Sequence, residues 1–270
     1  MIRYYGERPA KPDFLELTEV GYTKEFFDDC TICMKDEPPT SYKVWCVDPY
    51  NLAVDDIIAI LKDREMPSQA YVLEGFPGAG KTTLTKILSS TPGAFVVKEY
   101  IDYLPNGKEY LGKYLSQEMS VVDFQVGVVL RSFIEQILSP EFRKAKFIIF
   151  DREPLSITNL FLHMAPGPYD ADLIKKCVNN VEKIISSIFP NTVIFKSALS
   201  DPLSRNTRFY MFLDVPYEEI RRRLTKRGNK CELSAYTQQY YDTFTSLLND
   251  YRESIIDQTK SKNQKKTKND

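Results

Sequence analysis

Residues 75–83 read GFPGAGKTT and fit the pattern G-x-x-x-x-G-K-[ST]. Glycines let the backbone wrap an anion with several N–H groups pointing inward, and a following helix directs its positive end to the same point. The lysine of this pattern reaches the outer phosphates and the threonine hydroxyl ligates magnesium. We call residues 75–83 the phosphate loop. Its residues expected to bind a nucleoside triphosphate are Gly75, Gly78, Gly80, Lys81, Thr82 and Thr83.

Polar residues also follow two other apolar runs of strand length. Glu99 follows residues 94–98, and Asp151 and Arg152 follow residues 146–150. In open α/β sheets the ligand lies beyond the carboxyl ends of the strands, so these residues should converge on the phosphate loop. Asp151 is suited to supporting magnesium, and Arg152 to gripping a transferring phosphoryl group.

Residues 221–230 carry six cations in ten positions. A helix C-terminus with Gly228 as its stop would explain one or two of them, because cations complement the helix dipole there. A flexible basic lid that closes over ATP explains the density better, since phosphoryl transfer relies on charge neutralisation.

The apolar patterns predict an α/β fold. Strands are expected at 70–73, 94–98, 146–150 and 209–213, with a short strand at 192–196, and helices alternate with them. This alternation predicts a central parallel sheet flanked by helices. We expect a core at 70–257, with a last helix at about 234–256. An N-terminal extension, 1–69, is expected to be partly irregular with one helix, and 258–270 to be a disordered basic tail.

The composition excludes several classes of protein. A net charge of -1 provides no global field for a nucleic acid polymer, and no apolar run approaches the roughly 18 residues of a membrane span. Five scattered cysteines suit free thiols in a reducing compartment, the cytoplasm. Cys30 and Cys33 form a C-x-x-C, but a zinc site needs four ligands and the only histidine, His163, is far away in sequence.

The ordered motifs resemble the deoxynucleoside kinases over roughly residues 70–250. They are Glu99, Phe124-Gln125, Asp151-Arg152-Glu153-Pro154, and Arg223-x-x-x-Arg227-Gly-x-x-x-Glu232. The segment IIFDREPLS is most similar to the herpesviral thymidine kinase branch, which would place the chain in a host cytoplasm. The resemblance implies a P-loop kinase fold with an arginine-rich lid, and ATP and Mg²⁺ as cofactors. It also implies 5′-phosphorylation of a deoxynucleoside that feeds dNTP and DNA synthesis, and it leaves a homodimer open.

The resemblance implies roles for the polar residues. Glu99 would deprotonate the 5′-hydroxyl, Arg152 would hold the 5′-oxygen and the transferred phosphate, and Asp151 would support magnesium. Arg223 and Arg227 match the lid arginines. The residues it assigns to the nucleoside are Gln125 for the base edge, Phe161 for base stacking, Glu232 for the 3′-hydroxyl, and Tyr114 as partner of Glu232, with Tyr110 and Tyr103 as alternatives. Two of these residues have an alternative interpretation. Phe161 could be an ordinary core residue, and Gln125 could be a polar residue on the surface of a helix.

Several positions depart from the family pattern. Asn229 stands where a third lid arginine is common, and Tyr100 and Leu104 replace a usual proline and tryptophan. Ile157 stands where cellular enzymes carry an aspartate that reads cytosine, which favours thymidine or broader use. The family's last strand is missing, and we hypothesise that residues 42–47 fill that edge of the sheet.

Two alternative functions remain open. A thymidylate kinase shares the loop, the Asp-Arg pair and an arginine lid, but its monophosphate acceptor needs cations, and Lys98 beside Glu99 could supply one. A nucleotide-dependent switch or scaffold would use the first 69 residues as a module that binds a partner. Phosphate transfer to an acceptor distinguishes the kinases from the switch or scaffold, because a switch hydrolyses ATP without a nucleoside acceptor.

Overall fold

The computed structural model describes residues 3–4, 45–46, 49–50, 52, 54–62, 67, 69–194, 206–228 and 230–266. Cys30 and Cys33 lie outside the described residues, so the prediction of ordinary thiols there stays a prediction. No helix within these ranges is long and apolar enough to cross a membrane.

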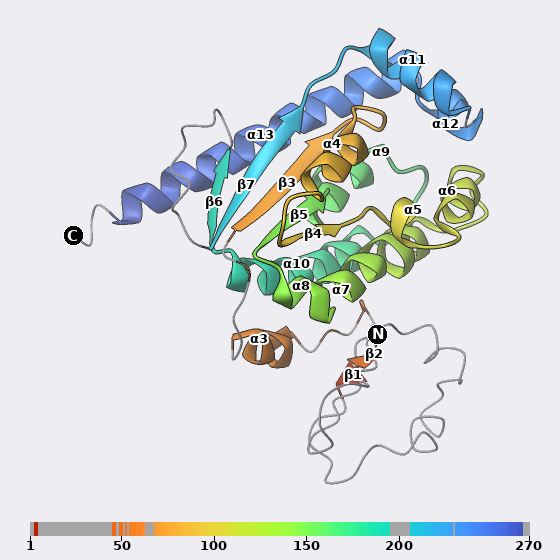
Figure 1. Cartoon of the computed structure of the whole chain (residues 1–270). Coiled ribbons are helices and arrows are strands. Elements are labelled where there is room, and N and C mark those ends of the chain that lie inside the picture. The colour runs from red at the N-terminus through yellow and green to blue at the C-terminus, as the bar shows by residue number, and fades with distance from the viewer. Residues whose placement is uncertain are drawn as a thin grey trace, which may run out of the picture.

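A five-stranded parallel sheet forms the centre of the molecule (Figure 1). Its strands, in spatial order, are β4 (Ala94–Val97), β5 (Phe147–Asp151), β3 (Gln69–Gly75), β7 (Thr207–Leu213) and β6 (Asn191–Ile194). The predicted parallel sheet is therefore confirmed, with strand ends shifted by one or two residues. The interior residues of β5 are buried, as expected for a parallel strand covered on both faces.

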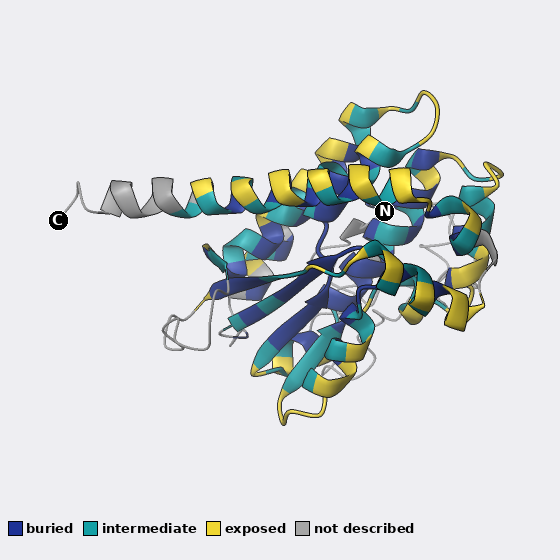
Figure 2. Ribbon diagram, turned by 90° about the horizontal axis from the view of Figure 1, so that it is seen from above, coloured by how far each residue is buried: buried dark blue, intermediate teal, exposed yellow. Residues whose placement is uncertain are grey.

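Helices cover both faces of this sheet, and buried residues concentrate on the strands (Figure 2). The long helix α10 (Ala171–Ile188) is amphipathic, and its buried face includes Cys177, Val181 and Ile184. The helical segments are α3 (Val54–Lys62), α4 (Lys81–Leu88), α5 (Tyr100–Tyr103), α6 (Gly107–Leu115), η1 (Asp123–Leu130), α7 (Arg131–Ile137), α8 (Pro140–Lys144), η2 (Ile157–Phe161), α9 (Leu162–Met164), α10 (Ala171–Ile188), α11 (Tyr217–Arg227), α12 (Lys230–Ala235) and α13 (Gln238–Lys266). The segments η1 and η2 have the wider π-helical turn.

The hypothesis that residues 42–47 fill an edge of the central sheet is wrong for the two of them that form a described strand. Trp45–Cys46 (β2) pairs antiparallel with Arg3–Tyr4 (β1) in a separate two-stranded sheet. This local antiparallel pairing already occupies backbone groups that the hypothesis assigned to the central sheet.

The expectation of a disordered tail from residue 258 is also wrong as far as Lys266, because α13 continues to that residue. Residues 257–266 contain no Pro or Gly that would interrupt a helix. The Thr259 hydroxyl also donates to the Thr192 carbonyl of β6 at 3.1 Å, which attaches the helix to the sheet.

Candidate active site

The phosphate loop connects β3 to α4 at the carboxyl edge of the sheet. Gly75, Gly78 and Gly80 have φ angles of 152°, 86° and 104°, in the region that favours glycine. A Cβ atom on Gly75 would lie 2.8 Å from the Leu213 carbonyl oxygen. The loop conformation therefore requires glycine at its first position, which explains the sequence pattern.

The two residues after the last loop glycine point to different partners. Lys81 is buried, and its Nζ donates to the carbonyls of Gly75 at 3.3 Å and Phe76 at 3.5 Å. Burial, followed by the charge of Arg152, lowers the pKa of Lys81. The Thr82 hydroxyl lies 3.0 Å from Asp151 Oδ2. The start of α4 thus places a cation and a hydroxyl beside the loop.

Arg152 joins three parts of the site. Its Nε donates to the Glu99 carboxylate, its Nη1 to Glu74 Oε2 at 3.2 Å, and its Nη2 to the Gly75 carbonyl at 2.6 Å. Its guanidinium carbon lies 5.1 Å from the ring centroid of Phe161, within cation–π range. The backbone of Arg152 has a φ of 73°, which is uncommon for a residue with a side chain. The guanidinium is therefore fixed between the phosphate loop and Glu99.

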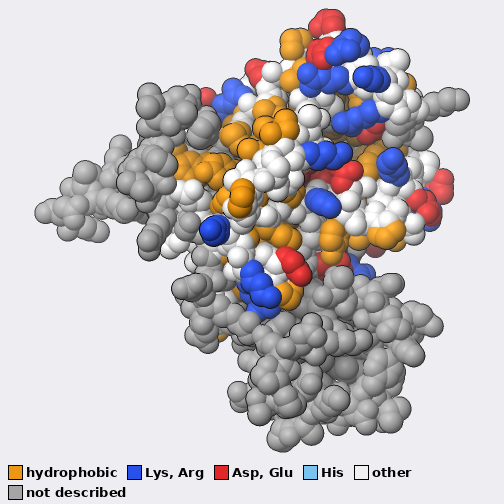
Figure 3. Space-filling model, viewed as in Figure 1, with side chains coloured by type: hydrophobic (Ala, Val, Ile, Leu, Met, Phe, Trp, Pro, Cys, Tyr) orange, Lys and Arg blue, Asp and Glu red, His pale blue; other side chains and the backbone are white. Residues whose placement is uncertain are grey.

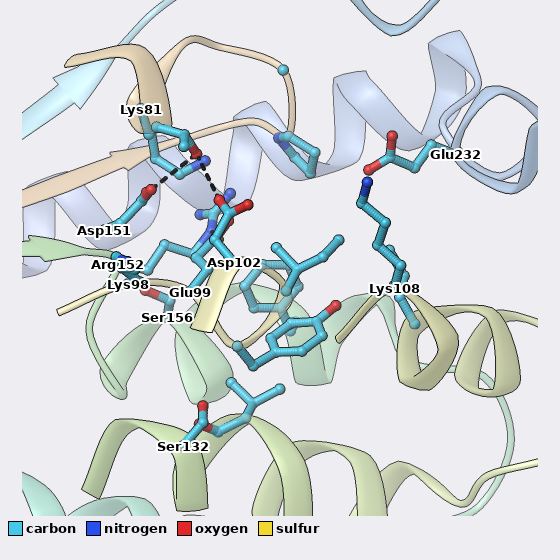
Figure 4. Close-up of a pocket in the computed structure, with 18 of the residues that line it drawn as sticks. Lys81, Lys98, Glu99, Asp102, Lys108, Ser132, Asp151, Arg152, Ser156 and Glu232 are labelled. Carbon is cyan, nitrogen blue, oxygen red and sulfur yellow. Dashed lines mark hydrogen bonds and ion pairs between the residues drawn. The ribbon is translucent and has the colours of Figure 1, made fainter. Parts of the chain in front are cut away.

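Glu99 lies at the N-cap position of α5, where the chain leaves β4. Burial by itself raises its pKa, but Lys81 and Arg152 together outweigh burial and lower it. The side chain is therefore a carboxylate at neutral pH. It faces the same space as Lys81 (Figure 4).

Asp151 ends β5 and lies opposite Thr82. Burial, and then the charge of Glu99, raises the pKa of Asp151 to about 6. Its Oδ1 is buried and has no hydrogen-bond partner among the described residues. A carboxylate oxygen in this state, next to the Thr82 hydroxyl, fits the oxygen ligand set of Mg²⁺.

A cavity of about 840 Å³ lies in front of the loop. Its wall includes thirteen of the residues that the sequence assigned to the site: Gly78, Gly80, Lys81, Thr82, Thr83, Glu99, Tyr114, Gln125, Asp151, Arg152, Phe161, Arg227 and Glu232. The Glu99 carboxylate faces the cavity in front of the loop, as the sequence-based hypothesis required. Figure 4 shows Glu232 and Lys108 pointing toward one another on the far side of the cavity.

The far end of the cavity is built around Gln125. This residue is buried in η1, and its Oε1 has no partner among the described residues, so the surface interpretation of Gln125 is wrong. Tyr114 stacks on Phe124 with the ring centroids 4.1 Å apart, and burial raises the pKa of Tyr114 in spite of the Gln125 side chain, which lowers it. Phe161 lines the cavity, and its ring centroid lies 5.9 Å from that of Phe244. Its role in base stacking stays a prediction.

Residues 221–227 of the basic segment form the C-terminal part of α11, and Gly228 ends this helix with a φ of 73°. Lys and Arg side chains gather over this region of the surface (Figure 3). Arg223 Nη1 donates to the carbonyls of Ala79 at 2.8 Å and Gly78 at 3.2 Å, whereas Arg227 lines the cavity. The two arginines thus lie in different places, one on the loop backbone and one facing the cavity.

Two acidic residues of the site, Glu74 and Asp102, belong to none of the motifs predicted from the sequence. Glu74 is fully buried between Arg152 and Ser156, and burial raises its pKa to about 7. Asp102 Oδ2 lies 3.4 Å from the Thr82 hydroxyl. Glu74 could have been predicted from the sequence, because an acid directly after the apolar run that leads into the phosphate loop is unusual. No comparable pattern identifies Asp102.

These features define a P-loop kinase: a parallel sheet flanked by helices, with a phosphate loop, an Asp-Arg pair and an adjoining basic helix. The family model for deoxynucleoside kinases matches residues 71–268, and the chain belongs to this family. The resemblance proposed from the motifs is confirmed at the level of the family.

Two solved structures are similar to the chain. One is deoxyadenosine kinase from M. mycoides with bound dATP, with 22% identity, a TM-score of 0.43, and coverage of 70% of this chain and 87% of that one. The other is the M. mycoides enzyme with bound dCTP, with 20% identity, a TM-score of 0.45, and coverage of 69% and 84%. The comparison with curated proteins finds no match.

Proposed function

We propose that the protein transfers the γ-phosphate of ATP to the 5′-hydroxyl of a deoxynucleoside, and that its preferred acceptor is thymidine. The observation that carries this proposal is the convergence of Lys81, Glu99 and Arg152 on one cavity beside the phosphate loop. A nucleoside kinase needs a proton acceptor beside a phosphate-binding cation, and this pair of groups supplies both.

The proposed mechanism depends on charge already fixed in the site. Glu99 takes the proton of the 5′-hydroxyl, and its lowered pKa keeps it ionised before the reaction. Arg152 stabilises the oxygen that attacks and the phosphoryl group that moves, while Lys81 stabilises the outer phosphates. Mg²⁺, when held by Thr82 and Asp151, would neutralise charge on the phosphate oxygens.

The preference for thymidine is inferred from Gln125 and Ile157. A carboxamide can accept the thymine N3–H on Oε1 and donate to O4, and in the described part of the chain Gln125 Oε1 is buried without a partner. Ile157 is buried and lines the same cavity, where an acidic residue would favour cytosine. Because a carboxamide also pairs with adenine, deoxyadenosine is the acceptor that must be compared directly.

The test is transfer from labelled ATP to thymidine, deoxycytidine, deoxyadenosine, deoxyguanosine and dTMP, with product analysis. We expect the highest kcat/KM for thymidine and no transfer to 5′-deoxythymidine, which lacks the hydroxyl. A higher kcat/KM for another nucleoside would overturn the base assignment alone. ATP hydrolysis without transfer to any acceptor would favour the switch or scaffold.

Thymidylate kinase activity is the second candidate, because Lys98 and Lys108 both line the cavity. A monophosphate acceptor requires such cations beside it. The thymidine proposal instead predicts only weak transfer to dTMP, because the ionised Glu99 carboxylate would repel the phosphate of the acceptor. A kcat/KM for dTMP above that for thymidine would make this second candidate the function. The homodimer and the cytoplasmic location stay predictions.

A further inference from the structure

The short strand that leads to Glu99 lies at an edge of the sheet. β4 has β5 as its neighbour, and its last ladder pair joins Val97 to Phe150. Lys98 follows and has no strand partner among the described residues, and Glu99 comes directly after it at the start of α5. Ends of edge strands have few backbone hydrogen bonds, so another group must fix the position of the chain here.

The side chain of Gln136 on α7 supplies these hydrogen bonds. The Lys98 N–H donates to Gln136 Oε1 at 2.8 Å, and Gln136 Nε2 donates to the Lys98 carbonyl at 2.9 Å. Nε2 also donates to the Ser132 carbonyl at 3.1 Å, which settles the orientation of the carboxamide, since the opposite orientation would place two acceptors face to face. Gln136 is only 3% exposed. Its carboxamide thus satisfies both backbone hydrogen-bonding groups of Lys98.

We propose that Gln136 is a positioning residue for Glu99. The Gln136 carboxamide holds the backbone one residue before Glu99, while Arg152 holds the Glu99 carboxylate from the opposite end. Lys98 and Glu99 lie beside Arg152 in Figure 4. This inference rests on the proposed function, because it assigns Gln136 a role through the general base.

The first test is Gln136→Met, which keeps the length of the side chain but removes all three hydrogen bonds. Because a misplacement of about 1 Å can cost about 10²-fold in rate, we expect kcat for thymidine to fall about 10- to 100-fold, with KM for ATP unchanged. Ile134→Val, a buried change on the same helix, is the matched control for a general loss of packing. An equal fall in kcat in both variants would overturn the proposal.

The second test is a double-mutant cycle with Glu99→Gln. If Gln136 acts through Glu99, Gln136→Met should have little effect on kcat once the carboxylate is absent. Losses that simply multiply would overturn the positioning role and leave the proposed function intact. Full activity of Glu99→Gln would instead overturn the role of Glu99 and, with it, that of Gln136.

A third variant covers the case in which Gln136→Met does not fold. Gln136→Glu keeps the acceptor for the Lys98 N–H but, when ionised, loses both donated bonds. Its kcat relative to that of the unmodified protein should rise as the pH falls, because a protonated carboxyl group regains a donor. A ratio that does not change with pH would overturn the proposal.

Discussion

We expect Glu74→Gln to change the pH dependence of stability. Glu74 is fully buried in β3, and burial raises its pKa from 4.5 to about 7, in spite of the charge of Arg152. The folded protein therefore binds a proton at Glu74 over a pH range in which the unfolded chain has released it. The contribution of this group to stability falls as the pH rises from 4.5 to about 7.

The size of the effect follows from these two pKa values. One pKa unit corresponds to about 1.36 kcal/mol, so ionising Glu74 lowers the free energy of unfolding by about 2.5 kcal/mol between roughly pH 5 and pH 8. Glutamine does not ionise and keeps an oxygen that can accept from Ser156. We define the difference as the free energy of unfolding of Glu74→Gln minus that of the unmodified protein. This difference should be about 2.5 kcal/mol larger at pH 8 than at pH 5, because only the unmodified protein loses stability as the pH rises.

Urea unfolding at the two pH values measures this difference. The matched control is Glu219→Gln on the surface of α11, where hydrogen bonds from Arg222 and Arg223 lower the pKa of Glu219 to about 2. Glu219 is ionised in the folded protein at both pH values. The free energy of unfolding of Glu219→Gln, minus that of the unmodified protein, should therefore be nearly the same at both. If the difference for Glu74→Gln is also the same at both pH values, Arg152 keeps Glu74 ionised and the reasoning is refuted.

Four further outcomes are expected. Glu99→Gln should retain ATP binding by calorimetry and lose about 10²–10⁴-fold in kcat, and near-normal turnover would remove Glu99 from the mechanism. Lys81→Ala should reduce transfer by about 10²–10³-fold in the same assay, and a smaller loss would contradict its role. Asp151→Asn should weaken Mn²⁺ binding in the presence of ATP, measured by electron paramagnetic resonance; unchanged affinity would exclude it as a ligand. Gly75→Ala should destabilise the fold by about 1–3 kcal/mol in urea, because its Cβ would lie 2.8 Å from a carbonyl oxygen; unchanged stability would show that the loop can move.

The phosphate loop and the parallel strands could be predicted because both depend on short-range patterns. Glycine spacing sets the loop backbone, and a continuous apolar run such as 147–150 identifies a strand covered on both faces. The convergence of Glu99 and Asp151 followed from one rule, that parallel strands end at the same edge. These inferences needed no knowledge of which side chains touch.

The errors came from segments whose structure depends on distant contacts. Residues 258–266 lack apolar residues and suggested disorder, yet Thr259 binds β6 and α13 continues through them. The partner of Trp45–Cys46 could not be read from a strand pattern, because a pattern predicts that a segment is extended and not which segment it pairs with.

The sequence by itself determined the loop, the order of the strands along the chain, and the residue types that the chemistry needs. Only the tertiary structure decided how these residues are held: Glu74 meets Arg152 from 78 positions away, and Gln136 meets Lys98 from 38. Such contacts depend on how strands register and helices pack in three dimensions. A buried polar group must find a partner, but the sequence does not say which one.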